Sequence, residues 1–438
     1  MPGDEARALR LRWLVMLVPA AAYFFSYFHR VAPAVVAADV MRAFAITAAS
    51  LATLSAIYPY VFVAMALVAG SLVDTLGPRV TLALGVTAMG LGTIVFGAAP
   101  VFGVACAGRL LVGLGASVIL ISFLGLAAEW FRPREFAMLS GVSQTVGNVG
   151  GLVATAPLAL LVEAVGWRRS FELIGGLTVL LGAAAFALVR DRPEDSGLPP
   201  VNPARPRAGS LREVVAGMPA IVGNARTWPP VLAAAGIFAS LVSLQGLWGV
   251  SYLAAAYGMP RVRAAGMIAM LSVGIVVGAP LVGALSDRWL GRRRAPFLAL
   301  TALYAACWIP LALPAAQLPA GLLGPFFFLM GVASCGFVLV WACVREVNDP
   351  ARVGVVVGFC NMPIFFGFAL LQWMTGLLLD AHWTGTSARG VRLYPPAAYQ
   401  AAFLACGLVA LGALAGAALV TETRCRNVWR PAERAGPP

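Results

Sequence analysis

The sequence contains no lysine and few charged residues of any kind. Charged residues make up 11% of its 438 positions and hydrophobic residues 61%, whereas a typical soluble domain is about 25% charged. This composition excludes an ordinary soluble protein. The net charge of +13 reflects 31 arginines against 18 acidic residues. Because the arginines cluster at the ends of hydrophobic runs, they do not indicate nucleic-acid binding.

Motifs of metal and cofactor chemistry are also missing. The seven cysteines are scattered without a CxxC pair, which favours free thiols over disulfides or a metal site. A phosphate-binding loop of the GxxxxGK[ST] type requires a lysine, so ATP is excluded as the direct energy source. We therefore expect no metal, no cofactor, no catalytic residues and no enzymatic activity.

A short charged turn occurs twice, half a chain apart, between hydrophobic runs. Residues 70–79 read GSLVDTLGPR and residues 283–292 read GALSDRWLGR. A second repeated pattern pairs Glu129 and Pro133 with Glu346 and Pro350, 217 residues later. Two repeated patterns in the same order indicate an internal duplication.

Twelve hydrophobic runs are long enough to cross a bilayer as helices, which takes about 20 residues each. They predict an all-α membrane protein with twelve transmembrane helices in two pseudo-symmetric six-helix bundles. The expected helices cover residues 11–37, 51–73, 80–99, 103–131, 138–165, 172–189, 229–256, 264–285, 296–313, 320–344, 353–379 and 398–420. The expected domains are an N-terminal bundle (1–189), a linker (190–226) with a short helix at 210–216, a C-terminal bundle (227–421) and a tail (422–438).

The distribution of arginine predicts the orientation in the membrane. With both termini on one side, that side collects 22 arginines and the other collects seven. Positive residues concentrate on the cytoplasmic side, so we expect both termini, the linker and the tail in the cytoplasm of a bacterium, with the bundles in its inner membrane. The two remaining arginines, Arg30 and Arg109, fall inside predicted helices.

The two repeated turns resemble the loop motif of the major facilitator superfamily, which follows the second and eighth helices of that fold. The resemblance covers the whole chain and implies a secondary transporter that works by alternating access. It also implies that the acidic and basic residues of these turns latch the cytoplasmic gate, with an aspartate capping a helix of the other half. The residues concerned are Asp74, Arg79, Glu129, Asp287 and Arg292.

Arg30 is the sharpest candidate for substrate binding. Tyr23, Tyr27 and Arg30 lie at i, i+4 and i+7, on one face of a helix. A charge inside a span costs at least about 2.5–3.5 kcal/mol, which makes it a functional hypothesis, and a guanidinium suits carboxylate or phosphate. The alternative is a structural arginine bonded to backbone carbonyls.

The segment YFHRVAPAVV, residues 27–36, also resembles the first helix of organophosphate and organic-anion transporters. In the organophosphate exchangers a second arginine on the seventh helix completes a phosphate clamp. The predicted seventh helix, residues 229–256, has no basic residue. This difference favours a carboxylate over a phosphate ester.

Arg109, followed by Gly113, resembles the fourth-helix pattern that the superfamily associates with cavity charge and proton coupling. The alternative is a packing helix with a bonded arginine. No acidic residue lies in the middle of a predicted span. His29, which can titrate near neutral pH, is the candidate proton carrier, with simple packing as its alternative.

Further polar side chains fall on helix faces that the repeat would bring to one cavity. Gln245, Trp248 and Tyr252 lie at i, i+3 and i+7 of the predicted seventh helix. Amides at repeat-related positions are further candidates, with helix packing as the alternative: Gln144, Asn148 and Asn361.

These features together predict a monomeric secondary transporter of a small organic anion, with proton coupling left open. The partners expected are the solute, a co-transported proton and the lipid bilayer, and no nucleic acid. The first alternative is a drug or metabolite exporter, although the fifth predicted helix lacks that group's Gly-Pro pair. The second is a transporter-like membrane sensor.

Overall fold

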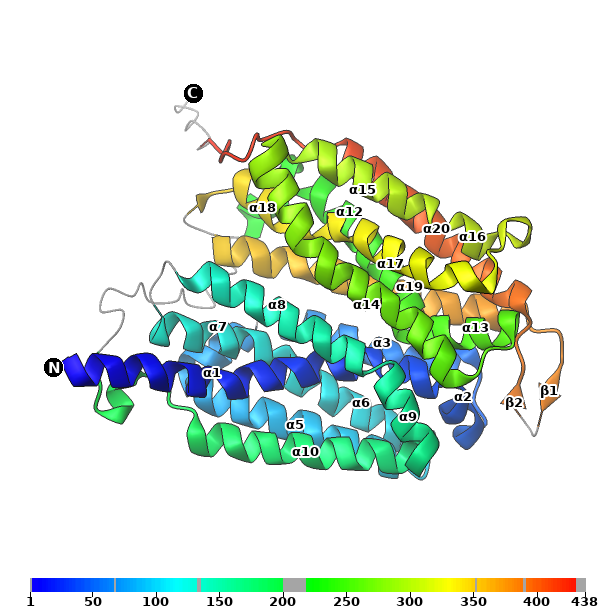
Figure 1. Ribbon diagram of the computed structural model, residues 1–438, viewed down its shortest axis with the longest axis horizontal. Helices are drawn as coiled ribbons and strands as arrows, with labels where there is room; N and C mark the ends of the chain where they lie inside the picture. The colour runs from blue at the N-terminus through cyan, green and yellow to red at the C-terminus, as the bar shows by residue number, and fades with distance from the viewer. Residues whose placement is uncertain are drawn as a thin grey trace.

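The computed structural model describes residues 2–66, 68–131, 135–199, 218–350, 353–388 and 391–430. These residues form a bundle of long helices with one two-stranded sheet (Figure 1). Twelve helices in the described part are long and apolar enough to cross a membrane. The predicted fold class is therefore confirmed. The predicted helix at 210–216 and the tail beyond residue 430 lie outside the described residues.

The first half, residues 2–199, contains ten α-helices. In chain order they are α1 (Pro2–Val31), α2 (Pro33–Phe44), α3 (Ala48–Met65), α4 (Val68–Leu76), α5 (Pro78–Ala98), α6 (Phe102–Ser117), α7 (Ile119–Trp130), α8 (Phe136–Val153), α9 (Ala156–Val165) and α10 (Trp167–Leu188). A 3₁₀ turn, η2 (Pro193–Ser196), follows.

The second half, residues 218–430, alternates α-helices with short π and 3₁₀ turns. In chain order they are η3 (Ala225–Thr227), α12 (Trp228–Ser243), η4 (Leu244–Trp248), α13 (Gly249–Tyr257), α14 (Arg261–Ala284), η5 (Leu285–Leu290), α15 (Arg294–Ala306), α16 (Ile309–Ala312), η6 (Pro314–Ala316), η7 (Ala320–Leu322), α17 (Leu323–Ser334), η8 (Cys335–Leu339), α18 (Val340–Glu346), α19 (Val353–Ala381) and α20 (Pro396–Ala418). Strands β1 (Ser387–Ala388) and β2 (Val391–Arg392) pair antiparallel between α19 and α20.

Several predicted helices are continuous in sequence but divided in the structure. The first one, expected over 11–37, ends at Val31 and restarts as α2 with Pro33 at its first position. Proline has no N–H and fits the first turn of a helix better than its interior. The chain therefore bends immediately after Arg30. The predicted seventh helix is similarly divided into α12 and α13 by the π turn η4.

Glycines let the helices of each half approach closely. An added Cβ on Gly92 of α5 would lie 2.6 Å from the carbonyl oxygen of Gly108 on α6. On the other half, a Cβ on Gly274 of α14 would lie 2.2 Å from the carbonyl oxygen of Phe328 on α17. Because lipid offers no hydrophobic drive for association, such small residues allow the packing that holds membrane helices together.

The two ends of the bundle differ. The start of α1 and the end of the described chain lie at one end, which we call the terminal end, and β1–β2 lies at the other, the hairpin end (Figure 1). The halves meet along α3 and α19. Near the hairpin end this approach is tight, because a Cβ on Gly376 would lie 2.4 Å from the Cβ of Ala52.

Candidate functional site

Arg30 lies in the last turn of α1, at the interface between the halves. Only 9% of its surface is exposed, and its Nε has no hydrogen-bond partner. Among the described residues no carboxylate forms an ion pair with it. A buried cation without an opposite charge is unfavourable in a membrane span, so this position calls for an anionic partner.

Aromatic rings from both halves surround the Arg30 guanidinium. Its central carbon lies 4.1 Å from the ring centroid of Tyr27 and 6.0 Å from that of Tyr58 in the first half. It lies 5.9 Å from Phe238 and 5.5 Å from Phe365 in the second half. Each such cation–π contact is worth about 0.5–2 kcal/mol, less than an ion pair with bidentate hydrogen bonds.

The polar residues predicted beside Arg30 in the first half do gather there. The rings of Tyr23 and Tyr27 are in edge contact, with centroids 5.1 Å apart. The Tyr27 hydroxyl donates to Gln144 Oε1 at 3.0 Å. Asn148, one turn further along α8, donates its Nδ2 to the Gln144 backbone oxygen at 2.9 Å. The Tyr27–Gln144 bond joins α1 to α8 next to Arg30, whereas Asn148 bonds within α8.

Arg109 supports the same region from α6. Its Nη1 donates to the backbone oxygen of His29 at 3.0 Å, and its Nε is buried without a partner. Its guanidinium carbon is 5.4 Å from the Tyr58 centroid. Tyr58, which the sequence analysis did not single out, therefore lies close to both intramembrane arginines.

His29 is buried on the other face of α1. Its ring nitrogens lie 3.5 Å from Thr93 Oγ1, and its ring contacts Phe28 edge-on, with centroids 5.6 Å apart. The side chain therefore packs against α5 and its own helix. Its backbone oxygen, rather than its ring, connects it to Arg109.

The polar candidates of the second half bond mainly within that half. Gln245 donates to Ser272 Oγ at 2.7 Å, and Trp248 donates its Nε1 to Thr375 Oγ1 at 2.9 Å. Asn361 donates to the backbone oxygen of Val357 on its own helix. The structure thus places these side chains in internal contacts, which differs from the expectation of a shared polar cavity.

Tyr252 is also buried in the core of the second half. Its ring contacts Phe403 edge-on, with centroids 5.0 Å apart, and its hydroxyl has no partner. The rings of Tyr257 and Tyr399 also border it, each with its centroid 6.1 Å away, so Tyr252 packs within an aromatic cluster of the second half.

A clamp at the hairpin end joins the halves. Asp380, in the last turn of α19, accepts the backbone N–H groups of Ala48 at 3.2 Å and Ala49 at 2.9 Å, at the start of α3. Tyr394 and Arg392 also donate to this carboxylate. The positive end of a helix dipole favours an anion at this position. Asp380 therefore caps a helix of the opposite half.

An ion pair adds to this clamp. Arg261, at the start of α14, lies 2.6 Å from the carboxylate of Asp39 on α2. Neither Asp380 nor Asp39 was predicted from the sequence. Both are acidic residues near the end of a predicted span, on the side of the membrane that has fewer arginines, and this position could have identified them.

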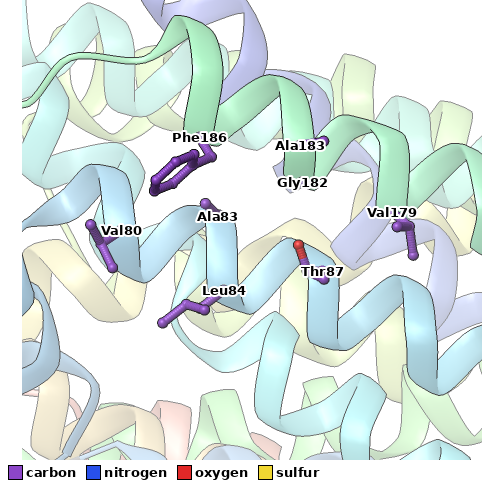
Figure 2. Close-up of a pocket in the computed structure, with 8 residues that line it drawn as sticks. All are labelled: Val80, Ala83, Leu84, Thr87, Val179, Gly182, Ala183 and Phe186. Carbon is purple, nitrogen blue, oxygen red and sulfur yellow. The ribbon is translucent and has the colours of Figure 1, made fainter.

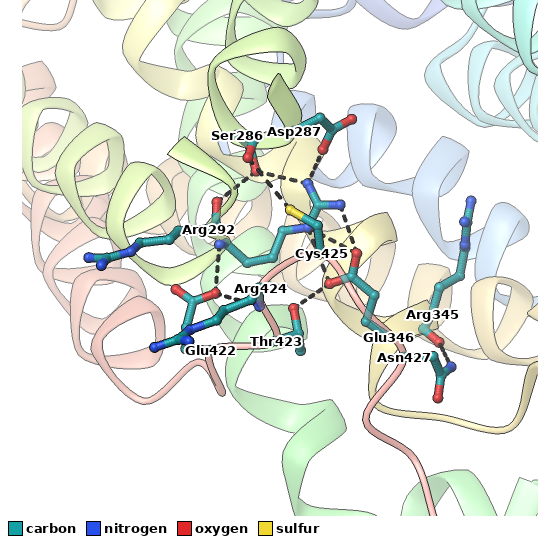
Figure 3. Close-up of polar contacts among 11 residues, drawn as sticks. Ser286, Asp287, Arg292, Arg345, Glu346, Glu422, Thr423, Arg424, Cys425 and Asn427 are labelled. Atoms are coloured by element: carbon teal, nitrogen blue, oxygen red, sulfur yellow. Dashed lines mark hydrogen bonds and ion pairs between the residues drawn. The ribbon is translucent and has the colours of Figure 1, made fainter. Parts of the chain in front are cut away.

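The terminal end of the second half carries a closed network of charges (Figure 3). Arg293 donates to Asp287 and, through Nε and Nη2, to Glu346 at 2.7–3.2 Å. Its side chain is 8% exposed, and these pairings raise the pKa of Arg293 although burial alone would lower it. The residue that forms these ion pairs is Arg293, next to the predicted gating residue Arg292.

The chain after α20 completes that network. Glu422 accepts the backbone N–H groups of Arg293 at 3.0 Å and Arg294 at 3.1 Å, where α15 begins. Thr423 donates its hydroxyl to Glu346, and Asn427 donates to the Arg345 backbone oxygen (Figure 3). The described part of the tail is thus bound to the second half.

The matching turn of the first half is more open. Asp74 is exposed. Arg79 donates its side chain to the backbone oxygen of Phe186, at 2.6 and 2.9 Å, and its backbone N–H to Asp191 at 2.7 Å. Glu129 lies 4.0 Å from Arg192, which follows α10.

A separate groove lies between α5 and α10 (Figure 2). Its volume is about 250 Å³. Its lining side chains are almost all apolar: Val80, Ala83, Leu84, Thr87, Val179, Gly182, Ala183 and Phe186. Because it offers no cation, it does not compete with Arg30 as an anion site. Among the described residues, no cluster of three histidine, cysteine or acidic side chains could hold a metal.

The twelve spans and the buried cation between two halves define a polytopic membrane protein. The chain belongs to the Major Facilitator Superfamily, whose family model matches residues 20–362 and 249–437. This confirms the family indicated by the repeated turns.

Relatives of the chain share low sequence identity over most of its length. The membrane sensor protein UhpC of Salmonella typhimurium is 23% identical over 87% of this chain and 88% of its own. A probable hexose phosphate transport protein of Chlamydia trachomatis is 22% identical over 78% and 77%. These confirm the likeness to the organophosphate branch, and neither name describes an enzyme.

A solved structure has the same fold. It is a bacterial homologue of the human lysosomal transporter Spinster in an inward-facing, occupied conformation, with a TM-score of 0.75 and 18% identity. The match covers 96% of this chain and 99% of that one.

Proposed function

We propose that the protein is a secondary active transporter that moves a small organic anion across the bacterial inner membrane, with both termini in the cytoplasm. The observation that carries the proposal is Arg30, a buried guanidinium between the halves that lacks a carboxylate partner in the described structure. Transporters of related architecture bind their substrates near the midplane, where the two repeats meet.

A carboxylate fits this site better than a phosphate ester. Arg109 already donates to the His29 backbone, and the predicted seventh helix contributes no basic residue. Arg30 can hold one carboxylate through two parallel hydrogen bonds. In this proposal Tyr23, Tyr27, Gln144 and Asn148 complete the polar side of the site, and Gln245, Trp248, Tyr252 and Asn361 support it from the second half.

The two ends of the bundle supply the gates. The Asp380 clamp holds the hairpin end closed, which supports an inward-facing state. When the halves rock, the turn containing Asp74 latches the terminal end instead. Asp380→Asn should weaken the first clamp and increase labelling of a cysteine introduced at Ser55, which is buried in α3, whereas Thr384→Asn in the hairpin loop serves as the control. Unchanged labelling in Asp380→Asn would contradict this gate assignment.

His29, next to Arg30 on α1, is the candidate proton carrier in this proposal. Its replacement by glutamine should leave anion exchange intact but remove the pH dependence of net uptake into proteoliposomes. If net uptake in His29→Gln keeps the wild-type pH profile, the proton takes another route.

A membrane sensor is the second candidate function, and its support is the similarity to UhpC over most of the chain. The two functions differ in one measurement, because only a transporter carries solute into sealed vesicles. Binding without exchange of a labelled solute would favour the sensor.

The proposal is tested by a thermal-shift screen of the purified protein against organic anions, repeated with Arg30→Ala. At least one carboxylate should raise the melting temperature of the wild type but not of the variant. Exchange of that anion in proteoliposomes then tests transport. A screen whose only hits are cations or neutral compounds would overturn the proposal.

A further inference from the structure

The rings that the second half presents to Arg30 carry no hydrogen-bonding group. Phe238 of α12 and Phe365 of α19 both lie within 6 Å of the guanidinium carbon. Both are only partly buried, although they lie inside a helix bundle. They lie between the Arg30 guanidinium and the core of their own half, against which they pack.

These two rings belong to a larger wall of phenylalanines. The Phe238 centroid lies 5.8 Å from Phe337, 5.7 Å from Phe365 and 5.8 Å from Phe368. Phe365 also stacks on Phe62 of α3, with centroids 4.8 Å apart and planes within 3°. The wall thus crosses the interface between the halves and borders Arg30 through Phe238 and Phe365.

Two amide candidates of the second half, Gln245 and Asn361, do not compensate for this wall. Gln245 donates to Ser272, and Asn361 donates to its own helix. Solute hydroxyls placed against the phenylalanine rings would lose their water and find no partner, which is unfavourable. A hydrocarbon body in the same position gains from the removal of apolar surface from water.

We infer that the solute is an amphipathic monoanion, a carboxylate with a compact apolar body rather than a polyhydroxylated acid or a sugar phosphate. This rests on the proposed function, because it takes Arg30 as the anion ligand. The carboxylate pairs with Arg30, and its hydrocarbon part lies against Phe238 and Phe365. The polar and apolar sides of the site thereby fix the orientation of the solute.

Matched acids test this inference on the purified full-length protein. The probes are cyclohexanecarboxylate and gluconate, which share a carboxylate and differ in the hydroxylation of the body. The measurement is the dissociation constant by calorimetry, in wild type and Arg30→Ala. We expect the apolar acid to bind at least tenfold more tightly, and Arg30→Ala to lose its binding, which also controls for partition into detergent.

Variants of the wall sharpen the test. Phe365→Tyr adds one hydroxyl to the wall and should reduce the preference for cyclohexanecarboxylate over gluconate about threefold or more. Phe365→Leu adds no hydroxyl and should keep that preference. Phe366→Tyr is the matched control, because Phe366 is 50% exposed on the neighbouring face of α19.

The outcomes separate the two claims. Equal or tighter binding of gluconate that still requires Arg30 overturns the apolar body and leaves the proposed function intact. Failure of both acids to bind, or binding that survives Arg30→Ala, overturns the proposed anion site and the inference with it.

Discussion

The two halves of this protein share a fold but contribute opposite chemistry to their interface. The first half supplies the guanidinium of Arg30 and the hydroxyl and amide groups of Tyr27 and Gln144. The second half supplies the phenyl rings of Phe238 and Phe365. The two halves thus share helix packing but differ in their interface residues, and in our proposal each half recognises a different part of one solute.

At the terminal end, by contrast, the second half carries the buried charged contacts. The second half closes a network in which Arg293 binds Asp287 and Glu346, and the chain after α20 covers it. The matching turn of the first half leaves Asp74 exposed. We interpret the second turn as a fixed structural element and the first as the mobile latch.

One feature is common to both halves. Asp191, just after α10, accepts the backbone N–H of Arg79 near the start of α5. Glu422, just after α20, accepts those of Arg293 and Arg294 at the start of α15. In each half, an acid after the last helix caps the third transmembrane helix, where the helix dipole favours a negative charge.

The largest expected effect comes from breaking the polar side of the interface. Arg30→Ala should remove measurable binding of the identified anion while the protein still inserts and purifies as a folded monomer. Gln245→Ala, on the equivalent helix of the second half, should change affinity far less because Gln245 bonds to Ser272. Calorimetry on both variants makes the comparison. Unchanged affinity in Arg30→Ala would make Arg30 structural and leave Arg109 as the anion candidate.

The geometry of the same cation gives the next prediction. Arg30→Lys keeps the charge but loses the planar fork that binds a carboxylate through two hydrogen bonds. We expect affinity to fall about tenfold or more without being lost, since charge-assisted bonds of this type are worth about 1.5–3 kcal/mol. Wild-type affinity in Arg30→Lys would show that charge alone, and not bidentate geometry, holds the solute.

Prediction from sequence succeeded where the signal was local or repeated. Hydrophobic runs predicted the twelve spans, and helical spacing predicted that Tyr23, Tyr27 and Arg30 share a face, because both depend on one segment. The partners of each residue depend on how separate segments pack. The rings around Arg30 come from α1, α3, α12 and α19, and no spacing along one helix predicts that set.

The repeat did not show which residue of the second turn forms the ion pairs. It aligns Arg292 with Arg79, whereas the adjacent Arg293 binds Asp287 and Glu346. Asp191 and Glu422 are 231 residues apart. This spacing differs from that of the repeated sequence patterns, so the repeat did not predict that both residues cap a helix. Asp380 caps a helix more than 300 residues away in sequence, a contact that only the assembled halves create.

Breaking the closed network should destabilise the protein more than breaking an ion pair in the first half. Glu346→Gln leaves Arg293 buried without its bidentate partner, and breaking a buried pair costs about 3–5 kcal/mol. Arg192→Gln, the control in the first half, breaks a 4.0 Å pair with Glu129 from the side of the exposed arginine and should cost less than about 1 kcal/mol. Thermal unfolding in one detergent compares them. Equal melting temperatures would contradict the structural role of the second network.

The latch assignment predicts a kinetic rather than a binding defect. Asp74→Asn should slow exchange in proteoliposomes several-fold while the dissociation constant stays close to wild type, because Asp74 lies away from the anion site. Asp287→Asn should be milder, since Arg293 retains Glu346 and its loop has the additional charges Arg288 and Arg294. Lost binding with normal residual exchange in Asp74→Asn would show that the turn is not a latch.

The smallest effect concerns the cap after the last helix, and it depends on pH. Burial alone would raise the pKa of Glu422, but backbone N–H donors from Arg293, Arg424 and Arg294 lower it overall. A carboxyl whose folded pKa is depressed stabilises the folded state above its unfolded pKa of about 4.3, and this contribution is lost as pH falls through the folded value. Glu422→Gln should therefore lower stability by about 1 kcal/mol at neutral pH, the typical worth of a helix cap, and the difference from wild type should shrink below about pH 4. Melting temperatures of both proteins between pH 3.5 and 7 measure this.

Asp191→Asn tests the matching cap of the first half. Asp191 accepts one backbone N–H at the start of its helix, whereas Glu422 accepts two, so we expect a smaller loss of stability at neutral pH. If the gap between wild type and Glu422→Gln instead stays constant across this range, the side chain stabilises the tail through packing rather than through its charge at the start of α15.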